Sequence, residues 1–101
     1  MDFNARTNLT DEQVNEALYA SAHALLEQER PRDAAAVLRL LLVRTPTDPR
    51  AWLALGWSHE CCDDEEIAAW LYEKGIEVCD DTDGRLARAL DRLDRVARRA
   101  S

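Results

Sequence analysis

The sequence predicts an all-α fold, and three observations support this prediction. Of its 101 residues only three are glycine and three are proline, which leaves little material for strands joined by tight turns. Apolar residues recur at intervals of three and four, the spacing of one face of a helix. Residues typical of helix ends divide the chain into five such segments. At this length, we expect one small domain.

The first helix is predicted to begin at Asp11. In "LTDEQV", Thr10 is a typical N-cap residue, and Gln13 three positions later completes a capping box. The buried face should follow apolar and small residues at helical spacing, namely Val14, Ala17, Leu18, Ser21 or Ala22, and Leu25. The stretch "EQERPRD" ends this pattern.

Two prolines mark the starts of the next two helices. Pro31 is predicted in the first turn of a second helix, because proline needs no amide hydrogen there. That helix, "RDAAAVLRLLLVR", is apolar on nearly all sides, so we expect it to be sandwiched between neighbours. Asp48, a capping carboxylate, and Pro49 then predict a third helix to about Glu60.

The fourth and fifth helices are predicted from similar signals. Asp63 and Glu66 have the spacing of a capping box, which predicts a helix through about Val78. After "DDTDG", the segment "RLARALDRLDRVARR" carries one apolar stripe, formed by Leu86, Leu90, Leu93 and Ala97.

The charge of the chain argues against nucleic acid as a partner. The net charge is −7, whereas a phosphate backbone needs a basic surface. Residues 1–79 carry 15 acids and 7 bases, and residues 80–101 carry 5 acids and 6 arginines. Because Asp91 and Asp94 interleave with those arginines and no aromatic residue lies there, we expect a solvated, salt-bridged helix face.

The chain is expected to be cytoplasmic, without a membrane span. Three cysteines cannot all pair with one another, and no charged and then apolar leader opens the sequence. Its apolar runs are far shorter than the ~20 residues that cross a bilayer.

The sequence repeats itself after 34 residues. This shift aligns Ala22 with Gly56 and Leu38 with Tyr72, and it also aligns Leu25 with His59 and Ala34 with Ala68. Small and large residues recur in phase, which predicts a repeated pair of helices.

The second unit, Trp52-x-x-Leu55-Gly56 followed by Ala68-x-x-x-Tyr72-x-x-Gly75, resembles the tetratricopeptide repeat (TPR). The resemblance implies a right-handed helical repeat stack of two helix-turn-helix units and a C-terminal capping helix. Its parts would be a tail at 1–10, repeats at 15–48 and 49–82, and a capping helix at 83–100, all in one domain. The first unit departs from the pattern at Leu18, Ser21 and Leu41.

The resemblance also implies a binding groove. In TPR proteins the first helices of successive repeats line a concave surface that binds a protein segment, either an amphipathic helix or an extended strand. Carried over residue by residue, the groove would contain Tyr19, His23, Leu26, Glu27, Leu53, Trp57, Glu60, Cys61, Ala87, Asp91 and Asp94. Its acidic residues would favour a basic partner. Trp57 should remain exposed there, whereas Trp52 and Trp70 should pack between helices.

Catalytic and metal sites are not predicted. His59, Cys61 and Cys62 lie near a helix end, where neighbouring side chains point ~100° apart and do not converge on one ion. With a lone Cys79 they do not form a standard zinc set, and the nearby Asp63 and Asp64 suit a helix start. His23 is the other histidine, and no nucleophile elbow or phosphate-binding glycine loop occurs. We therefore expect neither an enzyme nor a bound cofactor.

The chain further resembles the small TPR-type chaperones of bacterial type III secretion systems. The resemblance lies in its size, its two and a half repeats, its acidity and the stretches "PRAWLALGW" and "AAWLYEKG". It implies a virulence-associated chaperone that holds a needle, translocator or export component in a hetero-oligomer. The alternatives are a general adaptor or assembly factor, and a small metal- or thiol-dependent regulator that uses His59, Cys61, Cys62 and Cys79.

Overall fold

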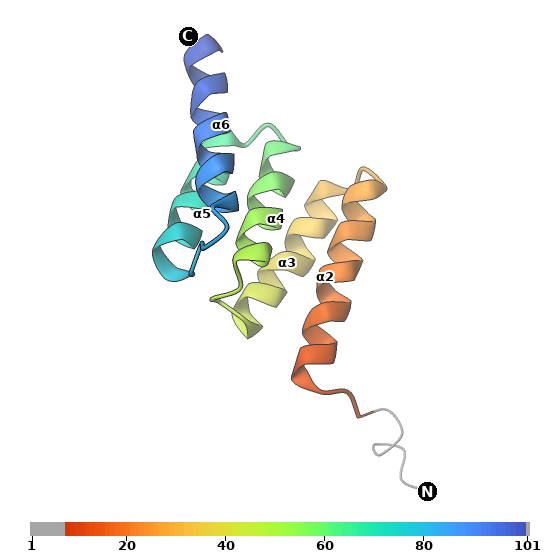
Figure 1. Ribbon diagram of the computed structural model, residues 1–101. Coiled ribbons are helices and arrows are strands. Elements are labelled where there is room, and N and C mark those ends of the chain that lie inside the picture. The colour runs from red at the N-terminus through yellow and green to blue at the C-terminus, as the bar shows by residue number, and fades with distance from the viewer. Residues whose placement is uncertain (1–7, 101) are drawn as a thin grey trace, which may run out of the picture.

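The computed structural model describes residues 8–100, apart from the side chains of residues 97, 98 and 100. This part of the chain forms five helices and no strand, which confirms the all-α prediction (Figure 1). The helices are α2 (Asp11–Glu27), α3 (Pro31–Arg44), α4 (Pro49–Glu60), α5 (Glu65–Val78) and α6 (Arg85–Ala100).

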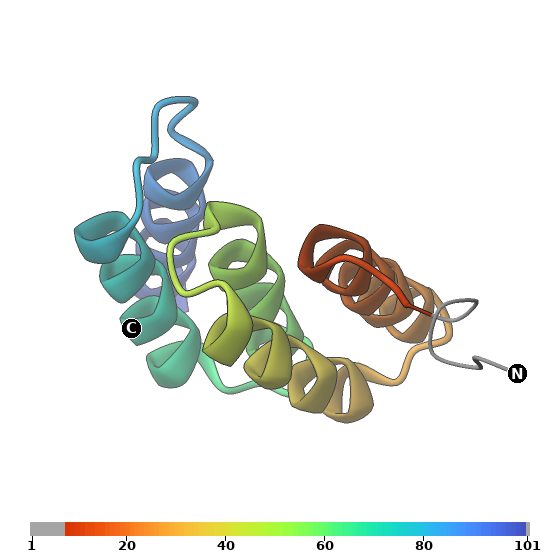
Figure 2. The same cartoon turned by 90° about the horizontal axis from the view of Figure 1, so that it is seen from below.

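The helices stack in the order of the sequence. Each packs against the next, and α4 also contacts α2 and α6. Viewed from below, α2, α4 and α6 follow one another on one side of the stack, with α3 and α5 on the other (Figure 2). This is the predicted TPR-like helical repeat architecture. None of the helices in the described residues is both long enough and apolar enough to cross a membrane.

The first three helices begin where local signals in the sequence predicted, two with a side-chain cap and α3 with Pro31 in its first turn. Thr10 Oγ1 accepts the Gln13 N–H at 3.1 Å, and the Thr10 N–H donates to Gln13 Oε1 at 2.9 Å, so the capping box is complete. Pro31 lies in the first turn of α3. Asp48 Oδ1 accepts the N–H of Arg50 at 3.0 Å at the start of α4. Because these signals act over a few residues, they were readable without knowledge of the tertiary structure.

The predicted capping box of Asp63 and Glu66 is wrong. Asp63 has a positive φ of 60°, and its N–H donates to the carbonyl of Glu60 at 3.0 Å. It therefore belongs to the turn that ends α4. Helix α5 begins only at Glu65, and Asp64 before it makes no side-chain capping bond.

The connection to α6 is closed by aspartates. The Asp81 carboxylate accepts the N–H groups of Leu86 and Ala87 at 3.2 and 3.1 Å, and Asp83 accepts that of Arg85 at 3.1 Å. These bonds satisfy amide groups that no helical carbonyl can reach.

Small residues let α4 and α5 cross closely, as the repeat pattern predicted. A Cβ atom at Gly56 would clash with the ring of Tyr72. A Cβ atom at Gly75 would lie 2.8 Å from Cβ of Trp52. The aromatic rings thus occupy space that only a glycine backbone leaves free.

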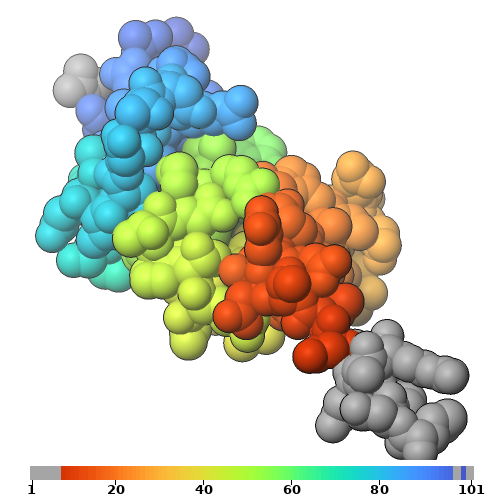
Figure 3. All heavy atoms as spheres, turned by 60° about the horizontal axis from the view of Figure 1, so that its bottom comes forward, coloured from red at the N-terminus to blue at the C-terminus, as the bar shows by residue number. Residues whose placement is uncertain are grey.

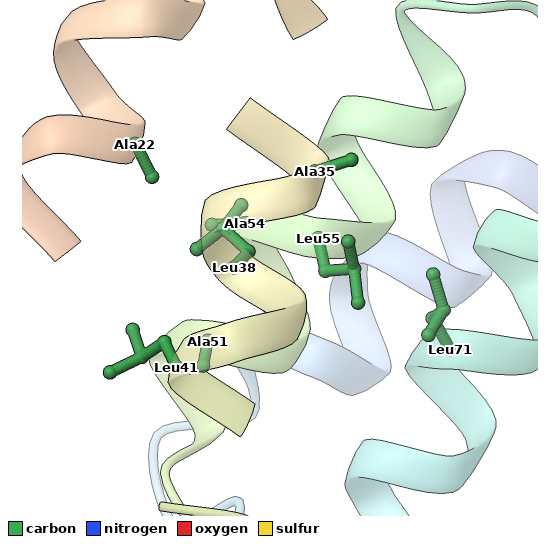
Figure 4. Close-up of a cluster of buried hydrophobic side chains, with 8 residues drawn as sticks. All are labelled: Ala22, Ala35, Leu38, Leu41, Ala51, Ala54, Leu55 and Leu71. Atoms are coloured by element: carbon green, nitrogen blue, oxygen red, sulfur yellow. The ribbon is translucent and has the colours of Figure 1, made fainter. Parts of the chain in front are cut away.

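The core consists of two neighbouring clusters. The larger draws on four helices and contains Ala22, Ala35, Leu38, Leu41, Ala51, Ala54, Leu55 and Leu71 (Figure 4). The smaller contains Ala68, Tyr72, Leu86 and Leu93. Trp52 packs against both clusters, and its Nε1–H donates to the carbonyl of Pro46 at 2.8 Å. The prediction that Trp52 packs between helices is confirmed.

One prediction of burial is wrong, and a second is confirmed without implying full burial. Trp70 is 57% exposed, because α5 turns its buried face, which includes Leu71 and Tyr72, toward its neighbours and Trp70 away from them. Helix α3 does lie between α2 and α4, but Leu40 and Val43 on it are 53% and 82% exposed. In so small a stack, two neighbours cover only part of an apolar helix.

The predicted apolar faces of α2 and α6 are mostly reproduced. On α2, Ala22 is buried and Val14, Leu18 and Leu25 are half-buried, whereas Ala17 and Ser21 are exposed. On α6, Leu86 and Leu93 are buried and Leu90 is half-buried, and the side chain of Ala97 lies outside the described residues.

Candidate functional site

A groove of about 320 Å³ opens between α2, α4 and α6. Its lining is mostly apolar and consists of Tyr19, His23, Leu26, Leu53, Ala54, Trp57, Tyr72, Ala89 and Arg92. The structure thus brings together five of the residues that the repeat register placed in the groove, namely Tyr19, His23, Leu26, Leu53 and Trp57.

The α2 side of the groove carries two aromatic rings in tilted contact. Tyr19 and His23 lie one turn apart, with ring centroids 4.6 Å apart at an angle of 55°. The guanidinium of Arg50 lies 4.7 Å from the centroid of Tyr19 and is bound to Glu16 at 2.7 Å and Asp48 at 3.0 Å. Burial raises the pKa of Tyr19, so its phenol stays neutral.

These ion pairs also fix the end of the stack where α2 begins. The hydrogen bond of Arg50 to Glu16 joins α2 to α4, and Arg44 of α3 donates to Asn15 of α2 at 2.8 Å. The space-filling view shows the start of α2 beside the turn that joins α3 to α4 (Figure 3). The part of α2 that leads to Tyr19 is therefore held by side-chain bonds from both α3 and α4.

On the α4 side, Trp57 remains 48% exposed. The guanidinium of Arg92, from α6, lies 5.6 Å from the centroid of the indole ring, within the range of a cation–π contact. Helix α6 thus covers part of Trp57 but does not close over it. A large, half-exposed ring between apolar neighbours offers an apolar contact to another molecule.

Glu60 holds Arg92 in place. Its two carboxylate oxygens accept bonds from Arg92 at 3.0 and 2.7 Å, and it also accepts the hydroxyl of Tyr72. The side chain of Glu60 is only 10% exposed. Burial and this hydrogen bond raise the pKa of Tyr72, and the bond to Glu60 raises the pKa of Arg92. Glu60 lies next to the groove, but its charge is balanced by Arg92 within the chain.

Helix α6 presents different residues from those expected. Ala87, Asp91 and Asp94 are absent from the groove lining, whereas Ala89 and Arg92 are part of it. The reason is a change of phase. The inward residues Leu86, Ala89, Leu90 and Leu93 follow their α4 equivalents Ala51, Ala54, Leu55 and Ser58 by 35 residues. Arg92, the residue after the predicted Asp91, therefore lines the groove in its place.

The sequence already contained a signal for Arg92. The stripe of Leu86, Leu90 and Leu93 defines the buried face of α6. The helical spacing places Arg92 outside this face, on the exposed side of the helix. The groove positions on α6 were predicted from the 34-residue repeat alone, without using this stripe. Tyr72 and Ala54 also line the groove and were missed, because Tyr72 was assigned only to the repeat pattern and Ala54 was not singled out.

The remaining predicted residues lie apart from the groove. Cys61 borders a separate polar hollow, which also includes Cys62 and residues 29–33 from the turn after α2 and the start of α3. Glu27 is exposed at the end of α2 and is not part of the groove lining. Their part in partner binding stays a prediction.

The cysteines and His59 form no recognisable metal site in the described residues. There, no group of three or more histidine, cysteine or acidic side chains is arranged to hold an ion. His59 Nδ1 lies 3.4 Å from Oδ2 of Asp64. Burial raises the pKa of the thiols of Cys61 and Cys79, which favours the protonated and unreactive form.

Comparison with protein families gives one match. Residues 15–58 match the model of the tetratricopeptide repeat, a region that spans most of α2, all of α3 and most of α4. Comparisons with curated proteins and with solved structures gave no significant match. The match and the five stacked helices together fit a TPR-like helical repeat, which is a protein-interaction architecture.

Proposed function

We propose that this TPR-type repeat stack is a protein-binding module whose partner occupies the groove between α2, α4 and α6. The main observation is the half-exposed Trp57, which shares an open, mostly apolar groove with Tyr19 and Leu53. Clustered apolar and aromatic surface of this kind is typical of interaction sites, and tryptophan is among the residues that contribute most to binding.

The partner segment is proposed to be an amphipathic helix. The sides of the groove are helices, whose backbone N–H and C=O groups bond within each helix. They offer no row of unpaired groups to which an extended strand could add. Recognition therefore depends on side chains, and a helix presents apolar side chains on one face at the spacing of the groove residues.

A narrower role is a cytoplasmic chaperone that holds a type III secretion component before export. This role is supported by the residue resemblance and by a stack of two and a half repeats, whose groove a partner could complete. A general adaptor or assembly factor would use the same groove. The metal- or thiol-dependent regulator has less support, because burial raises the pKa of Cys61 and Cys79.

Two exposed tryptophans provide a matched test. A partner captured from the native host and identified by mass spectrometry would be titrated against wild type, Trp57→Ala and Trp70→Ala. Trp57→Ala should weaken binding at least about tenfold with little change in Tm. Trp70→Ala, which truncates an equally exposed ring outside the groove, should change neither quantity. Unchanged affinity in Trp57→Ala would exclude the groove as the binding site.

A further inference from the structure

We infer that the partner helix carries acidic side chains at one end, where it meets a row of arginines on α6. The arginine row consists of Arg88, Arg92, Arg95 and Arg99. This inference rests on the proposed function and specifies the chemistry of the partner.

The arginine row continues the groove. Its four members line a hollow together with Asp91 and Val96, and Arg92 also lines the apolar groove. Spacings of four, three and four residues keep the arginines on one face of α6. The C-terminal part of α6 extends beyond the neighbouring helices (Figure 1). A helix lying across Leu53 and Trp57 could therefore continue along this row.

The charge of this region is opposite to that of the chain. Residues 85–101 contain six arginines and two aspartates, a formal net charge of +4, whereas the whole chain has a net charge of −7. The local field near α6 thus favours an acidic ligand. This reverses the expectation of a basic partner, which depended on the acidic groove residues Glu27, Glu60, Asp91 and Asp94.

The ion pairs within the chain leave the arginines able to bind. Arg95 pairs with Asp91 at 2.9 Å, but both side chains are exposed, and such pairs contribute little to stability. Arg88 donates to the carbonyl of Asp83 at 2.8 Å through one nitrogen. Arg92 uses two nitrogens on Glu60. Since a guanidinium has five N–H donors, each arginine can donate to a further carboxylate without losing its present bond.

A peptide selection tests the inference without a known partner. The probe is a displayed library of 18-residue helices with a fixed apolar stripe and random polar positions, selected on the full chain. We expect the enriched peptides to concentrate aspartate and glutamate at one end. The acidic excess should disappear on the Arg88→Gln/Arg95→Gln variant. It should persist on Arg32→Gln/Arg39→Gln, which removes the same charge from exposed arginines of α3.

The strongest acidic peptide would then be synthesised and titrated. It should bind wild type at least about tenfold more tightly than Arg88→Gln/Arg95→Gln, and added salt should reduce the difference. The inference would be overturned if the enriched peptides had no acidic excess, or if the excess were also found on the Arg88→Gln/Arg95→Gln variant. Either result would leave the groove function intact. If peptides were enriched no more strongly on wild type than on Trp57→Ala, both the inference and the groove function would be overturned.

A second copy of the chain is another possible occupant, since residues 1–79 are acidic. Sedimentation of the protein alone addresses this. We expect a sedimentation profile that is the same for wild type and Arg88→Gln/Arg95→Gln. A salt-sensitive oligomer that the variant abolishes would assign the arginine row to self-association and overturn the inference.

Discussion

Glu29 and Asp63, 34 residues apart, adopt the same left-handed backbone conformation, with φ of 59° and 60°. Each lies in the turn that follows the first helix of a pair. In the first turn the N–H of Arg30 donates to the carbonyl of Leu25 at 2.9 Å, and the equivalent bond in the second turn is also 2.9 Å long. Both turns have the hydrogen bonds of a Schellman motif. The 34-residue period of the sequence is therefore reproduced in the backbone hydrogen bonds of the two turns.

Replacement of Asp63 by glycine should stabilise the protein. A Cβ atom in the left-handed region clashes with the backbone, and glycine removes this clash. Glycine also costs more conformational entropy on folding, which reduces the gain. The net increase in the free energy of unfolding should be about 0.5–1 kcal/mol, measured by urea denaturation. Asp63→Ala is the control, because it removes the carboxylate but keeps Cβ and should give no such gain. A Gly variant no more stable than the Ala variant would contradict a strained turn.

Enlarging Gly56 should disrupt the crossing of α4 and α5. Any side chain at this position meets the ring of Tyr72, so Gly56→Leu should cost ~1–3 kcal/mol by overpacking. Ala24→Leu is a suitable control, since Ala24 is exposed on α2. Gly84 is not, because its φ of +69° makes any side chain strained there. Equal shifts in Tm for the first two variants would mean that this crossing does not depend on glycine.

Trp52 and Trp70 should differ sharply in their effect on stability. Trp52 packs against both core clusters and donates a hydrogen bond to Pro46, so Trp52→Ala should lose ~3–5 kcal/mol. Trp70 is exposed, and Trp70→Ala should change the free energy of unfolding by less than ~0.5 kcal/mol. Chemical denaturation of both variants decides the point, and a large loss in Trp70→Ala would show that another surface covers it.

Removing the adjacent cysteines should have little effect. Cys61→Ser/Cys62→Ser should retain the helical circular dichroism of wild type and the affinity for peptides selected on the groove. Because burial raises the pKa of Cys61, its thiol should react slowly with iodoacetamide at pH 7 and faster as the pH rises. Stoichiometric zinc in the wild-type protein, lost together with the fold in the variant, would favour the metal-dependent regulator.

Helix starts could be read from the sequence where the signal was local. Thr10 and Gln13 bond to each other, so their identities suffice to predict the start of α2. Asp63 shows where this reasoning fails. An aspartate can precede the first residue of one helix or lie in the turn that ends the previous helix. The hydrogen bond from the Asp63 N–H to the Glu60 carbonyl shows that Asp63 lies in the turn.

Burial and the groove depended on contacts that the sequence does not specify. Trp70 was misplaced because its position on α5, away from the face that buries Leu71 and Tyr72, determines its exposure more than its apolar ring does. Of the positions carried over to α2 and α4, five line the groove, whereas Glu27, Glu60 and Cys61 do not. The predicted positions of α6 also do not line it, because the stripe that contains Leu86 and Leu93 sets the rotation of this helix.

The contacts of α2 have a consequence for local unfolding. Among the described helices, α2 packs against α3 and, less extensively, α4, and it has no contact with α5 or α6. In such a linear stack, an end helix can open at a lower free energy than the whole domain. Amide hydrogens of α2 should therefore exchange with solvent before those of α4. Tyr19 and His23 of α2 line the groove. A ligand that bridges α2 and α4 would therefore slow amide exchange most strongly in α2.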